Sequence, residues 1–296
     1  MTGESMKSAR QLVDALRIEQ PPNKSLGQHF LIDDDILEKI ITHADLNEND
    51  HVLEIGPGPG TLTQVLMKNC GKVTAIEFDE GACKHLEYEF KTQINEGKLD
   101  LISGDALTQK WPEKIDAVVA NIPYQISSPL IEKLTQFLRN ARFSGPRICV
   151  LMVQEEFAMR LVMPEWPDHS SLGMCAKMDW SSELLDHIPP HHFSPSPLVH
   201  SRLVKMSPCE WEYDIDRKLV KTLIQSAFSE RRKKIRTSLK SVPKRISRVP
   251  GWHAKRWKDA YLELRDEEIM EHRPEELEFE DWIDLALDFQ DGLVID

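Results

Sequence analysis

The sequence lacks the paired cysteines, long apolar runs and leader segment that mark several classes of protein. Its five cysteines are scattered without a Cys-x-x-Cys pair, so we expect reduced, mostly buried thiols and no disulfide framework. No apolar run approaches the roughly 18 residues of a membrane span. The start MTGESMKSAR has no apolar signal-peptide core. These absences predict a cytoplasmic protein with no membrane partner.

Metal-ligand spacing is also missing. His191, His192 and His200 lie close together near prolines, but no suitable Cys or carboxylate spacing accompanies them. Packed or surface histidines are commoner than histidine ligands. We therefore predict no metal site.

Acidic residues are absent from one stretch of an otherwise acidic chain. The net charge is −12, yet residues 231–258 hold 12 Lys or Arg and no Asp or Glu. The remaining sequence carries 25 basic residues against 49 acidic ones. A charge run is usually a solvated face, but this contrast favours contact with the phosphates of a nucleic acid.

The 296 residues have room for one large and one smaller domain. Short apolar runs predict strands at 51–56, 72–78, 99–103, 116–121 and 147–153, with helices at 61–69, 80–90 and 129–140. This alternation is typical of a mostly parallel sheet covered on both faces. A helix is predicted at 8–18, an irregular arm at 21–33, and further strands at 172–180, 183–189 and 198–206.

The pattern changes near residue 208, which divides the chain into predicted domains 1–208 and 209–296. Helical spacing follows at 216–240, 254–264 and 273–289. The second domain is therefore expected to be small and helical.

A glycine loop follows the first strand of the predicted sheet. Gly56, Gly58 and Gly60 lie between that strand and a helix, where the backbone can approach a ligand. The spacing differs from the Gly-x-Gly-x-x-Gly of dinucleotide sites, so a pyrophosphate is not clearly expected. Glu77, at the end of the second strand, can accept both hydroxyls of a ribose, and Asp105, after the third, can accept from an adenine amine. An adenosine ligand without a diphosphate points to S-adenosylmethionine.

The stretch Asn-Ile-Pro-Tyr ends the fourth strand. Pro123 restricts Ile122 to an extended conformation, so that the Ile122 carbonyl can project into the cleft. Asn121 adds a second acceptor, and Tyr124 offers a face on which a base can stack. Two acceptors can hold both hydrogens of an adenine amine and aim its lone pair at a methyl group, so no nucleophilic Ser or Cys is needed.

These motifs resemble those of the KsgA family, the dimethyladenosine methyltransferases of small-subunit ribosomal RNA. The motifs NKSLGQHFL, EIGPGPG, AIEFD, GDAL, NIPY, HFSPSPLVHSRLV and FSERRKKIRTSL occur in that family's order over about residues 23–290. The resemblance implies a Rossmann-like α/β methyltransferase domain at 1–208 and a small helical RNA-binding domain at 209–296. It implies dimethylation at N6 of two adjacent adenosines in a hairpin near the 3′ end of that RNA, during ribosome biogenesis.

The resemblance also implies the site residues. Cofactor contacts would fall on His29, Leu31, Gly56, Gly58, Glu77, Asp105 and Asn121. The acceptor site would be Asn121, Ile122, Pro123 and Tyr124, with Phe193 as an aromatic wall of the target pocket. RNA contacts would fall on Arg231, Arg232, Lys233, Lys234 and Arg236. Two departures stand out: Ile122 replaces the family's usual Leu, and the stretch HSSLGMCAK lacks the Tyr-Gly-Arg-Leu of many relatives.

Other functions fit part of the pattern. A DNA adenine-N6 methyltransferase shares the logic of Asn-x-Pro-Tyr, and a non-catalytic assembly or transcription factor can retain the fold. Glu77, Asp105 and Asn121 argue against lost catalysis. A nicotinamide dehydrogenase is disfavoured by the glycine spacing. We expect a monomer whose partners are small-subunit ribosomal RNA and the precursor of the small ribosomal subunit.

Overall fold

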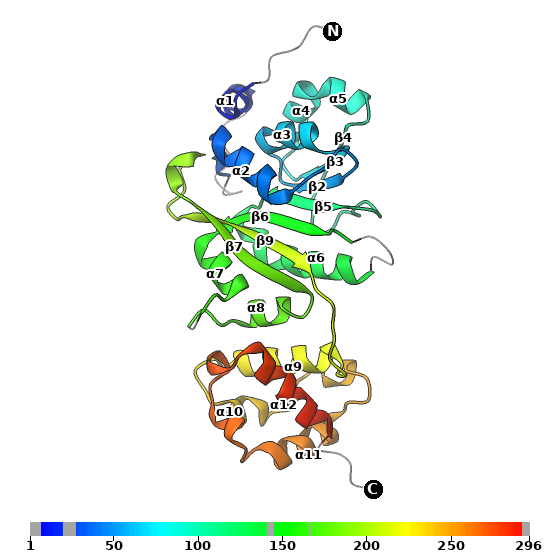
Figure 1. The fold of residues 1–296 in the computed structure, drawn as a ribbon, viewed down its shortest axis with the longest axis vertical. Helices are drawn as coiled ribbons and strands as arrows, with labels where there is room; N and C mark the ends of the chain where they lie inside the picture. Colours follow the sequence, from blue (N-terminus) through cyan, green and yellow to red (C-terminus); the bar gives the residue numbers. More distant parts are fainter. Residues whose placement is uncertain (1–6, 20–27, 141–144, 166, 292–296) are drawn as a thin grey trace. The chain divides into compact units, whose positions relative to one another are not determined.

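The computed structural model describes residues 7–19, 28–140, 145–165 and 167–291, so the NKSLG part of the arm (23–27) lies outside it. The chain divides into two compact units (Figure 1). The first contains residues up to Ala158 together with 181–208. The second contains 159–180 and the chain from Cys209 onward. Residues 159–180 thus group with the second unit, because Met163, Met174 and Met178 belong to its apolar core.

Seven strands form the central sheet in the described residues. Their spatial order is β4 (Leu99–Ser103), β3 (Lys72–Glu77), β2 (His51–Ile55), β5 (Ala117–Asn121), β6 (Ile148–Gln154), β9 (Ser201–Pro208) and β7 (Trp180–Ile188). The first five of these pair in parallel, and β9 runs antiparallel to β6. From β2 the chain adds β3 and β4 on one side of the sheet, and then β5 and β6 on the other side of β2. This change of direction opens a crevice beyond the carboxyl ends of β2 and β5.

Helices cover both faces of this sheet. Figure 1 shows α2 (Asp34–Ala44), α3 (Thr61–Asn69) and α4 (Glu80–Glu89) on one face and α6 (Ser127–Asn140) on the other. The first unit also contains α1 (Ala9–Glu19), which contacts α3 and α4, the short α5 (Lys91–Asn95), and the start of α7 (Glu155–Val162). The side chains of Asp33 and Asp79 cap the amino ends of α2 and α4, so the sequence specifies where these helices begin.

A second, two-stranded sheet joins distant segments of the first unit. The strand β1 (Phe30–Leu31) lies in the arm, and β8 (Phe193–Ser194) follows the turn η3 (Pro190–His192). They pair antiparallel, with Phe30 opposite Ser194 and Leu31 opposite Phe193. The arm is thereby held against the segment that precedes β9.

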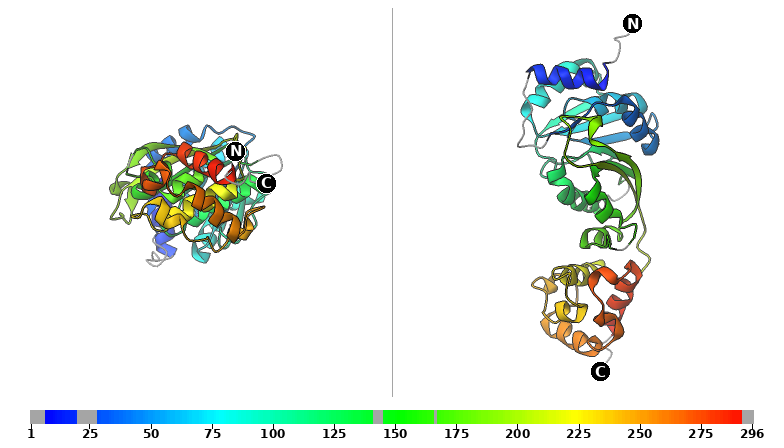
Figure 2. Two further views of the ribbon diagram at one scale, coloured as in Figure 1. Left: turned by 90° about the horizontal axis from the view of Figure 1, so that it is seen from below. Right: turned by 90° about the vertical axis from the view of Figure 1, so that its left-hand side faces the viewer.

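The second unit is helical and has its own core (Figures 1 and 2). Its helices are α8 (Ser171–Ala176), α9 (Arg217–Phe228), α10 (Ile235–Leu239), α11 (Ala254–Leu264) and α12 (Phe279–Asp291), with short turns η4 (Ile246–Arg248), η5 (Glu268–Glu271) and η6 (Pro274–Glu276). Trp257, Trp282 and Phe289 are fully buried in it. The spacing Trp282, Leu285, Ala286, Phe289 places four core side chains on one face of α12.

Three sequence predictions need correction. The helix expected at 273–289 begins only at Phe279, after the turn η6. The strand expected at 172–180 is mostly the helix α8, because the Ser170 hydroxyl caps Gly173 N and the apolar Met174 and Met178 recur at a helical interval. The single helix expected at 216–240 is interrupted. Residues 229–234 form a turn, and α10 begins at Ile235, whose side chain is buried in the core of the second unit.

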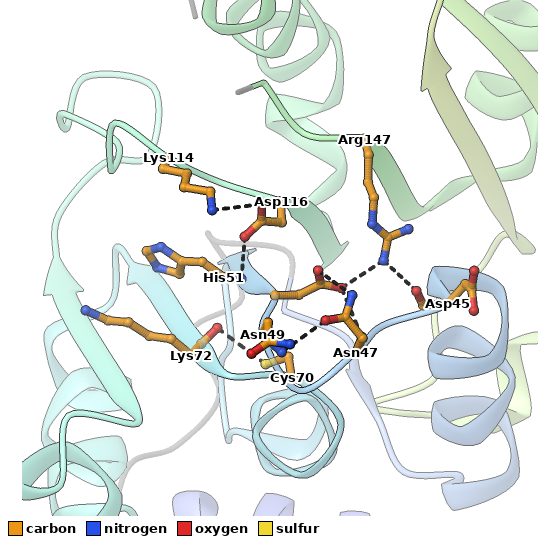
Figure 3. Close-up of polar contacts among 10 residues, drawn as sticks. Asp45, Asn47, Asn49, His51, Cys70, Lys72, Lys114, Asp116 and Arg147 are labelled. Atoms are coloured by element: carbon orange, nitrogen blue, oxygen red, sulfur yellow. Dashed lines mark hydrogen bonds and ion pairs between the residues drawn. The ribbon is translucent and has the colours of Figure 1, made fainter. Parts of the chain in front are cut away.

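A polar network ties together the amino ends of the parallel strands (Figure 3). Arg147, which precedes β6, forms a 2.8 Å ion pair with Asp50, and Asn47 also donates to the Asp50 carboxylate. Although burial opposes it, these hydrogen bonds hold the pKa of Asp50 below its ordinary value. Asp116 accepts a 2.8 Å hydrogen bond from His51 N. The network fixes the strand starts at the edge away from the crevice.

No helix in the described part of the chain combines the length and apolarity needed to cross a lipid bilayer.

We predict that Arg147→Met lowers the free energy of unfolding by about 1–3 kcal/mol, because the mostly buried Asp50 carboxylate loses a charged donor. Urea denaturation measures the change. The matched control is Lys110→Met, whose ion pair with Glu113 is solvent-exposed on both sides and should cost less than about 0.5 kcal/mol. Equal losses in the two variants would contradict the role of the network.

Candidate active site

The crevice between β2 and β5 holds a cavity of about 260 Å³. Backbone there is close-packed: Gly56 has φ +68°, and a Cβ on it would lie 3.3 Å from Pro123 Cδ. A Cβ on Gly58 would lie 2.8 Å from the Phe30 ring. Larger residues at these two positions would push into the residues that line the cavity. Nine of the predicted site residues line it: His29, Gly56, Gly58, Glu77, Asp105, Asn121, Ile122, Pro123 and Tyr124.

Glu77 ends β3 with its carboxylate in the wall of the cavity. Its oxygens accept hydrogen bonds from Gly58 N at 2.9 Å and Asp79 N at 2.8 Å, so its side-chain position is fixed. Burial raises its pKa, and the two backbone donors oppose that effect. Each carboxylate oxygen can accept a further hydrogen bond, which is what a pair of ribose hydroxyls requires.

Asp105 lies in a loop that the structure fastens at several points. Its Oδ1 accepts from Leu107 N at 2.8 Å. The Ala106 carbonyl accepts from both Lys133 Nζ (2.7 Å) and Trp111 Nε1 (2.9 Å), and Lys133 also donates to Gln109 O. Burial lowers the pKa of Lys133. Lys133 belongs to α6, which starts just after Tyr124. This helix therefore holds the Asp105 loop, which is the loop predicted to meet an adenine ring.

Asn121 and Ile122 bring the acceptor motif to the cavity. Asn121 Nδ2 donates to the His29 carbonyl at 3.4 Å, and Ile122 N donates to Met152 O at 3.0 Å. The Ile122 side chain is buried, so a ligand in the cavity would meet its backbone. Both residues are thus held by neighbouring segments.

Tyr124 is tied to two segments that are distant in sequence. Its hydroxyl shares a 2.9 Å hydrogen bond with Ser201 Oγ, and its ring stacks with the His29 ring at a centroid distance of 6.0 Å. His29 Nδ1 in turn donates to Pro195 O at 2.8 Å. Burial raises the pKa of the Tyr124 hydroxyl. The ring is therefore neutral and fixed beside the cavity.

Two predicted site residues do not reach the cavity. Leu31 and Phe193 face each other across the β1–β8 pair, are each 3% exposed, and pack in the apolar core of the first unit. Phe30, next to Leu31 in β1, lines the cavity instead, as does His29 just before the strand. Side chains alternate along a strand, so a shift of one residue decides which face each side chain meets.

Three residues that hold the site were missed from the sequence: Lys133, Pro195 and Ser201. Lys133 occupies an ordinary polar position on an amphipathic helix, and nothing in the sequence shows that its amine reaches two carbonyls of another loop. Ser201 and Pro195 act through bonds to Tyr124 and His29 that span more than 70 residues. For Pro195 and Ser201, the only indication in the sequence was that both lie in the family motif HFSPSPLVHS.

Glu54 is a buried carboxyl group beneath the glycine loop. It is 1% exposed, and its Oε2 has no hydrogen-bond partner within the described residues. Burial, with a contribution from the nearby Glu77 carboxylate, raises its pKa to about 8. Glu54 is therefore uncharged in the folded protein at neutral pH.

The predicted RNA-contact residues lie in the second unit, in a segment that we call the basic turn (residues 231–236). All five of its cations are exposed. Tertiary structure gives four of them carboxylate partners: Arg231 pairs with Glu275, Lys233 with Glu230, and both Lys234 and Arg236 with Glu271. Arg232 has no such partner in the described chain. The acid-free appearance of the sequence therefore does not carry over to the surface.

In the described residues, His, Cys, Asp and Glu side chains form no group of three or more that could hold a metal ion.

Comparison with known proteins decides the family. A sequence profile described as ribosomal RNA adenine dimethylase matches residues 20–250. This chain belongs to that dimethylase family. Family membership makes the protein an enzyme, an adenine dimethyltransferase of ribosomal RNA, and confirms the resemblance drawn from its motifs.

Individual dimethylase relatives cover most of the chain. A probable ribosomal RNA small subunit methyltransferase A of Thermococcus kodakarensis is 40% identical over 74% of this chain and 74% of its own length. The ribosomal RNA small subunit methyltransferase A of Prochlorococcus marinus is 34% identical over 91% of this chain and 95% of its own. Each match therefore extends well beyond the individual motifs.

Solved structures confirm the fold of the family. A dimethyladenosine transferase from Plasmodium falciparum superposes with a TM-score of 0.73 at 30% identity, covering 89% of this chain and 98% of that one. The 23S rRNA methyltransferase ErmE superposes with a TM-score of 0.62 at 21% identity, over 87% and 99%. The predicted Rossmann-like fold with carboxyl-terminal helices is thus correct.

We predict that Glu54→Gln changes how stability depends on pH. The folded pKa of Glu54, about 8, exceeds its ordinary 4.5, so this group favours the folded state most at low pH. Its contribution is lost as pH rises from about 4.5 to 8, by an amount on the order of 5 kcal/mol at 1.36 kcal/mol per pKa unit. A glutamine side chain cannot ionise, so the variant should gain stability over the wild type as pH rises from about 5 to 9.

Urea unfolding at about pH 5, 7 and 9 measures this difference, with Glu96→Gln, an exposed acid of the same unit, as the matched control. Parallel pH profiles for Glu54→Gln and the wild type would show that Glu54 is not a titrating group of the folded protein.

Proposed function

We propose that the protein transfers methyl groups from S-adenosylmethionine to N6 of two adjacent adenosines in a hairpin near the 3′ end of small-subunit ribosomal RNA. The observation that carries the proposal is one cavity lined by Glu77, Asp105 and the whole Asn121–Tyr124 motif. Carboxylates for an adenosine ligand and acceptors for a target amine thus line the same cavity. We also propose that it acts as a cytoplasmic monomer on the precursor of the small subunit.

The cavity residues fit the proposed methyl donor. Glu77 offers carboxylate oxygens whose positions are fixed by Gly58 N and Asp79 N, suited to a ribose diol. Asp105 and the loop held by Lys133 are suited to the adenine ring. His29, Gly56 and Asn121 complete the proposed cofactor contacts. When bound, S-adenosylmethionine supplies an electrophilic methyl group.

On the acceptor side, this chain's residues orient rather than attack. The lone pair of an adenine amine is delocalised into the ring, so the rate depends on position and on electrostatic stabilisation. The Asn121 side chain and the Ile122 carbonyl are proposed to accept the two amine hydrogens, and Tyr124 to stack on the base. The ties from Tyr124 to Ser201 and His29 keep that ring in place before substrate arrives.

The basic turn is proposed to bind the RNA backbone. Its ion pairs lie at the surface, where such pairs contribute only about 0–1 kcal/mol, so phosphates can displace the carboxylates. Arg231, Arg232, Lys233, Lys234 and Arg236 would then contact phosphates without reading bases. Binding at this turn must therefore compete with Glu271 and Glu275 of the protein itself.

Mass analysis of nucleosides tests the proposed function. Small-subunit RNA incubated with the protein and S-adenosylmethionine should yield N6,N6-dimethyladenosine at two adjacent positions. The same assay on duplex DNA distinguishes a DNA adenine methyltransferase, and an absence of methylated product on both would support a non-catalytic RNA-binding protein.

We predict that Asn121→Ala slows single-turnover methyl transfer by about 100-fold while RNA affinity changes little, because the amide is proposed to act on the amine in the transition state. Rapid-quench measurements and RNA titration separate the two effects. Asn140→Ala, an exposed position at the end of α6, is the matched control. A near-normal single-turnover rate in Asn121→Ala would remove Asn121 from the proposed role.

We predict opposite effects from the two sides of the basic turn. Replacing Arg231, Lys234 and Arg236 with Gln should reduce the slope of log affinity against log salt by roughly 2–3 units. Glu271→Gln should instead strengthen RNA binding, because Glu271 pairs with both Lys234 and Arg236. RNA titrations across a salt series measure both.

Glu263→Gln, an exposed acid on α11, controls for the change in net charge. If Glu271→Gln and Glu263→Gln change the RNA affinity equally, the proposal that Glu271 competes locally with phosphates is wrong. An unchanged salt slope in the triple variant would make the basic turn an ordinary solvated surface.

A further inference from the structure

The loop 195–200 exposes two adjacent apolar side chains beside the acceptor motif. Leu198 is 100% exposed and Val199 is 43% exposed. In the described residues, the other large exposed apolar side chains occur singly, and single cases need no explanation. The pair Leu198–Val199 therefore requires a reason.

Both ends of this loop are fastened to Tyr124. At the start, Pro195 O accepts from His29 Nδ1, and the His29 ring stacks on the Tyr124 ring. At the end, the loop leads into Ser201, whose hydroxyl bonds to the Tyr124 hydroxyl. His29 and Tyr124 line the cavity, so loop 195–200 is joined at both ends to residues of the cavity wall on the acceptor side, although none of its own residues lines the cavity.

The interior of the loop is also held. Ser196 Oγ donates to Pro190 O at 2.9 Å, Pro197 is buried, and Glu155 N donates to His200 O at 3.0 Å. Two prolines restrict the backbone further. These contacts hold the loop in a conformation that leaves the Leu198 side chain exposed to water. Covering this apolar side chain would lower the free energy of the system.

The surroundings suit the edge of a nucleic acid. The loop itself carries no acid, and the carboxylate of Glu155, which meets the end of the loop, is paired with Arg202 at 2.9 Å and lies 3.0 Å from His187 Nε2. The His187 and His200 rings stack at a centroid distance of 4.6 Å at the end of the loop. Phosphate repulsion is therefore low where an apolar side chain projects.

We propose that loop 195–200 is the RNA-facing rim of the acceptor site and that Leu198 inserts into the RNA base stack beside the target adenosine. An enzyme that acts on a base must unstack it, and an apolar side chain can fill the space that the base leaves. This inference rests on the proposed function. It adds a contact with neighbouring bases, separate from the residues that hold the target amine.

The test uses the full-length protein, S-adenosylmethionine and a hairpin RNA with two adjacent loop adenosines. Leu198→Ala should lower the single-turnover rate with subsaturating RNA by about tenfold. Leu198→Met, which keeps an apolar chain of similar volume, should restore most of it. Ile18→Ala, an exposed aliphatic position on α1, should match the wild type. S-adenosylmethionine affinity should be the same in all four proteins.

A second readout reports on the base itself. With 2-aminopurine at the target position, wild-type protein should increase the fluorescence by unstacking the base, and Leu198→Ala should increase it less. With an RNA whose flanking nucleotide is an abasic linker, there is no neighbour to unstack. On that RNA, Leu198→Ala should methylate as fast as the wild type.

The outcomes separate the inference from the function on which it rests. If wild type and Leu198→Ala methylate the intact hairpin equally, the role of Leu198 is wrong and the proposed function stands. A defect that persists on the abasic RNA, or that is accompanied by weaker cofactor binding, would also overturn the inference in favour of a structural role. If the wild type methylates neither RNA, the proposed function itself fails.

Discussion

The parallel pairing of β2 with β5 is the constraint on which the site depends. Val52 lies opposite Ala117 and Leu53 opposite Val118, so the loops after these strands leave the sheet side by side. The chain winds away from this pair in opposite directions, which leaves a crevice between the two loops. Gly56 and Pro123 approach closely because of this pairing, and a glycine is needed where the backbone has φ +68°. The polar network around Asp50 and Arg147 holds the opposite ends of the strands, which leaves the carboxyl edge free for binding.

Buried carboxyl groups concentrate at this edge and oppose stability there. Glu54 and Glu77 are both almost fully buried, and burial raises the pKa of each. The two differ in their partners: Glu77 receives two backbone donors, whereas Glu54 Oε2 receives none from the described residues. A carboxyl group that is already desolvated and fixed needs little reorganisation to bind a hydroxyl pair. The protein thus holds one acid ready for a ligand and a second acid uncharged beneath the glycine loop.

Charge on the second unit illustrates how tertiary structure changes a sequence pattern. Residues 231–258 contain no acid, yet acids from before and after this segment fold back onto it. These pairs lower the local positive potential and make RNA binding a competition. Further along the segment, cations such as Lys240, Lys244 and Arg245 are exposed and have no carboxylate partner in the described chain. The cations of this segment without a carboxylate partner in the described chain thus include Arg232 in the basic turn and residues beyond it.

The sequence by itself determined the parallel sheet, its helices and most of the cavity wall. Apolar runs and glycine, proline and capping residues act locally, so strands such as 72–77 and helices such as 61–69 and 254–264 were predicted almost to the residue. Consecutive parallel strands end on one edge, which is why Glu77, Asp105 and Asn121 could be placed together in advance. Tertiary structure alone decided that Phe193 and Leu31 face the core while Phe30 lines the cavity, because the register of a two-residue strand pair depends on a partner over 160 residues away. It likewise decided the bonds from Lys133 to the loop after β4 and from Ser201 to Tyr124, since a hydrogen bond between distant residues requires a geometry that neither residue's neighbours specify.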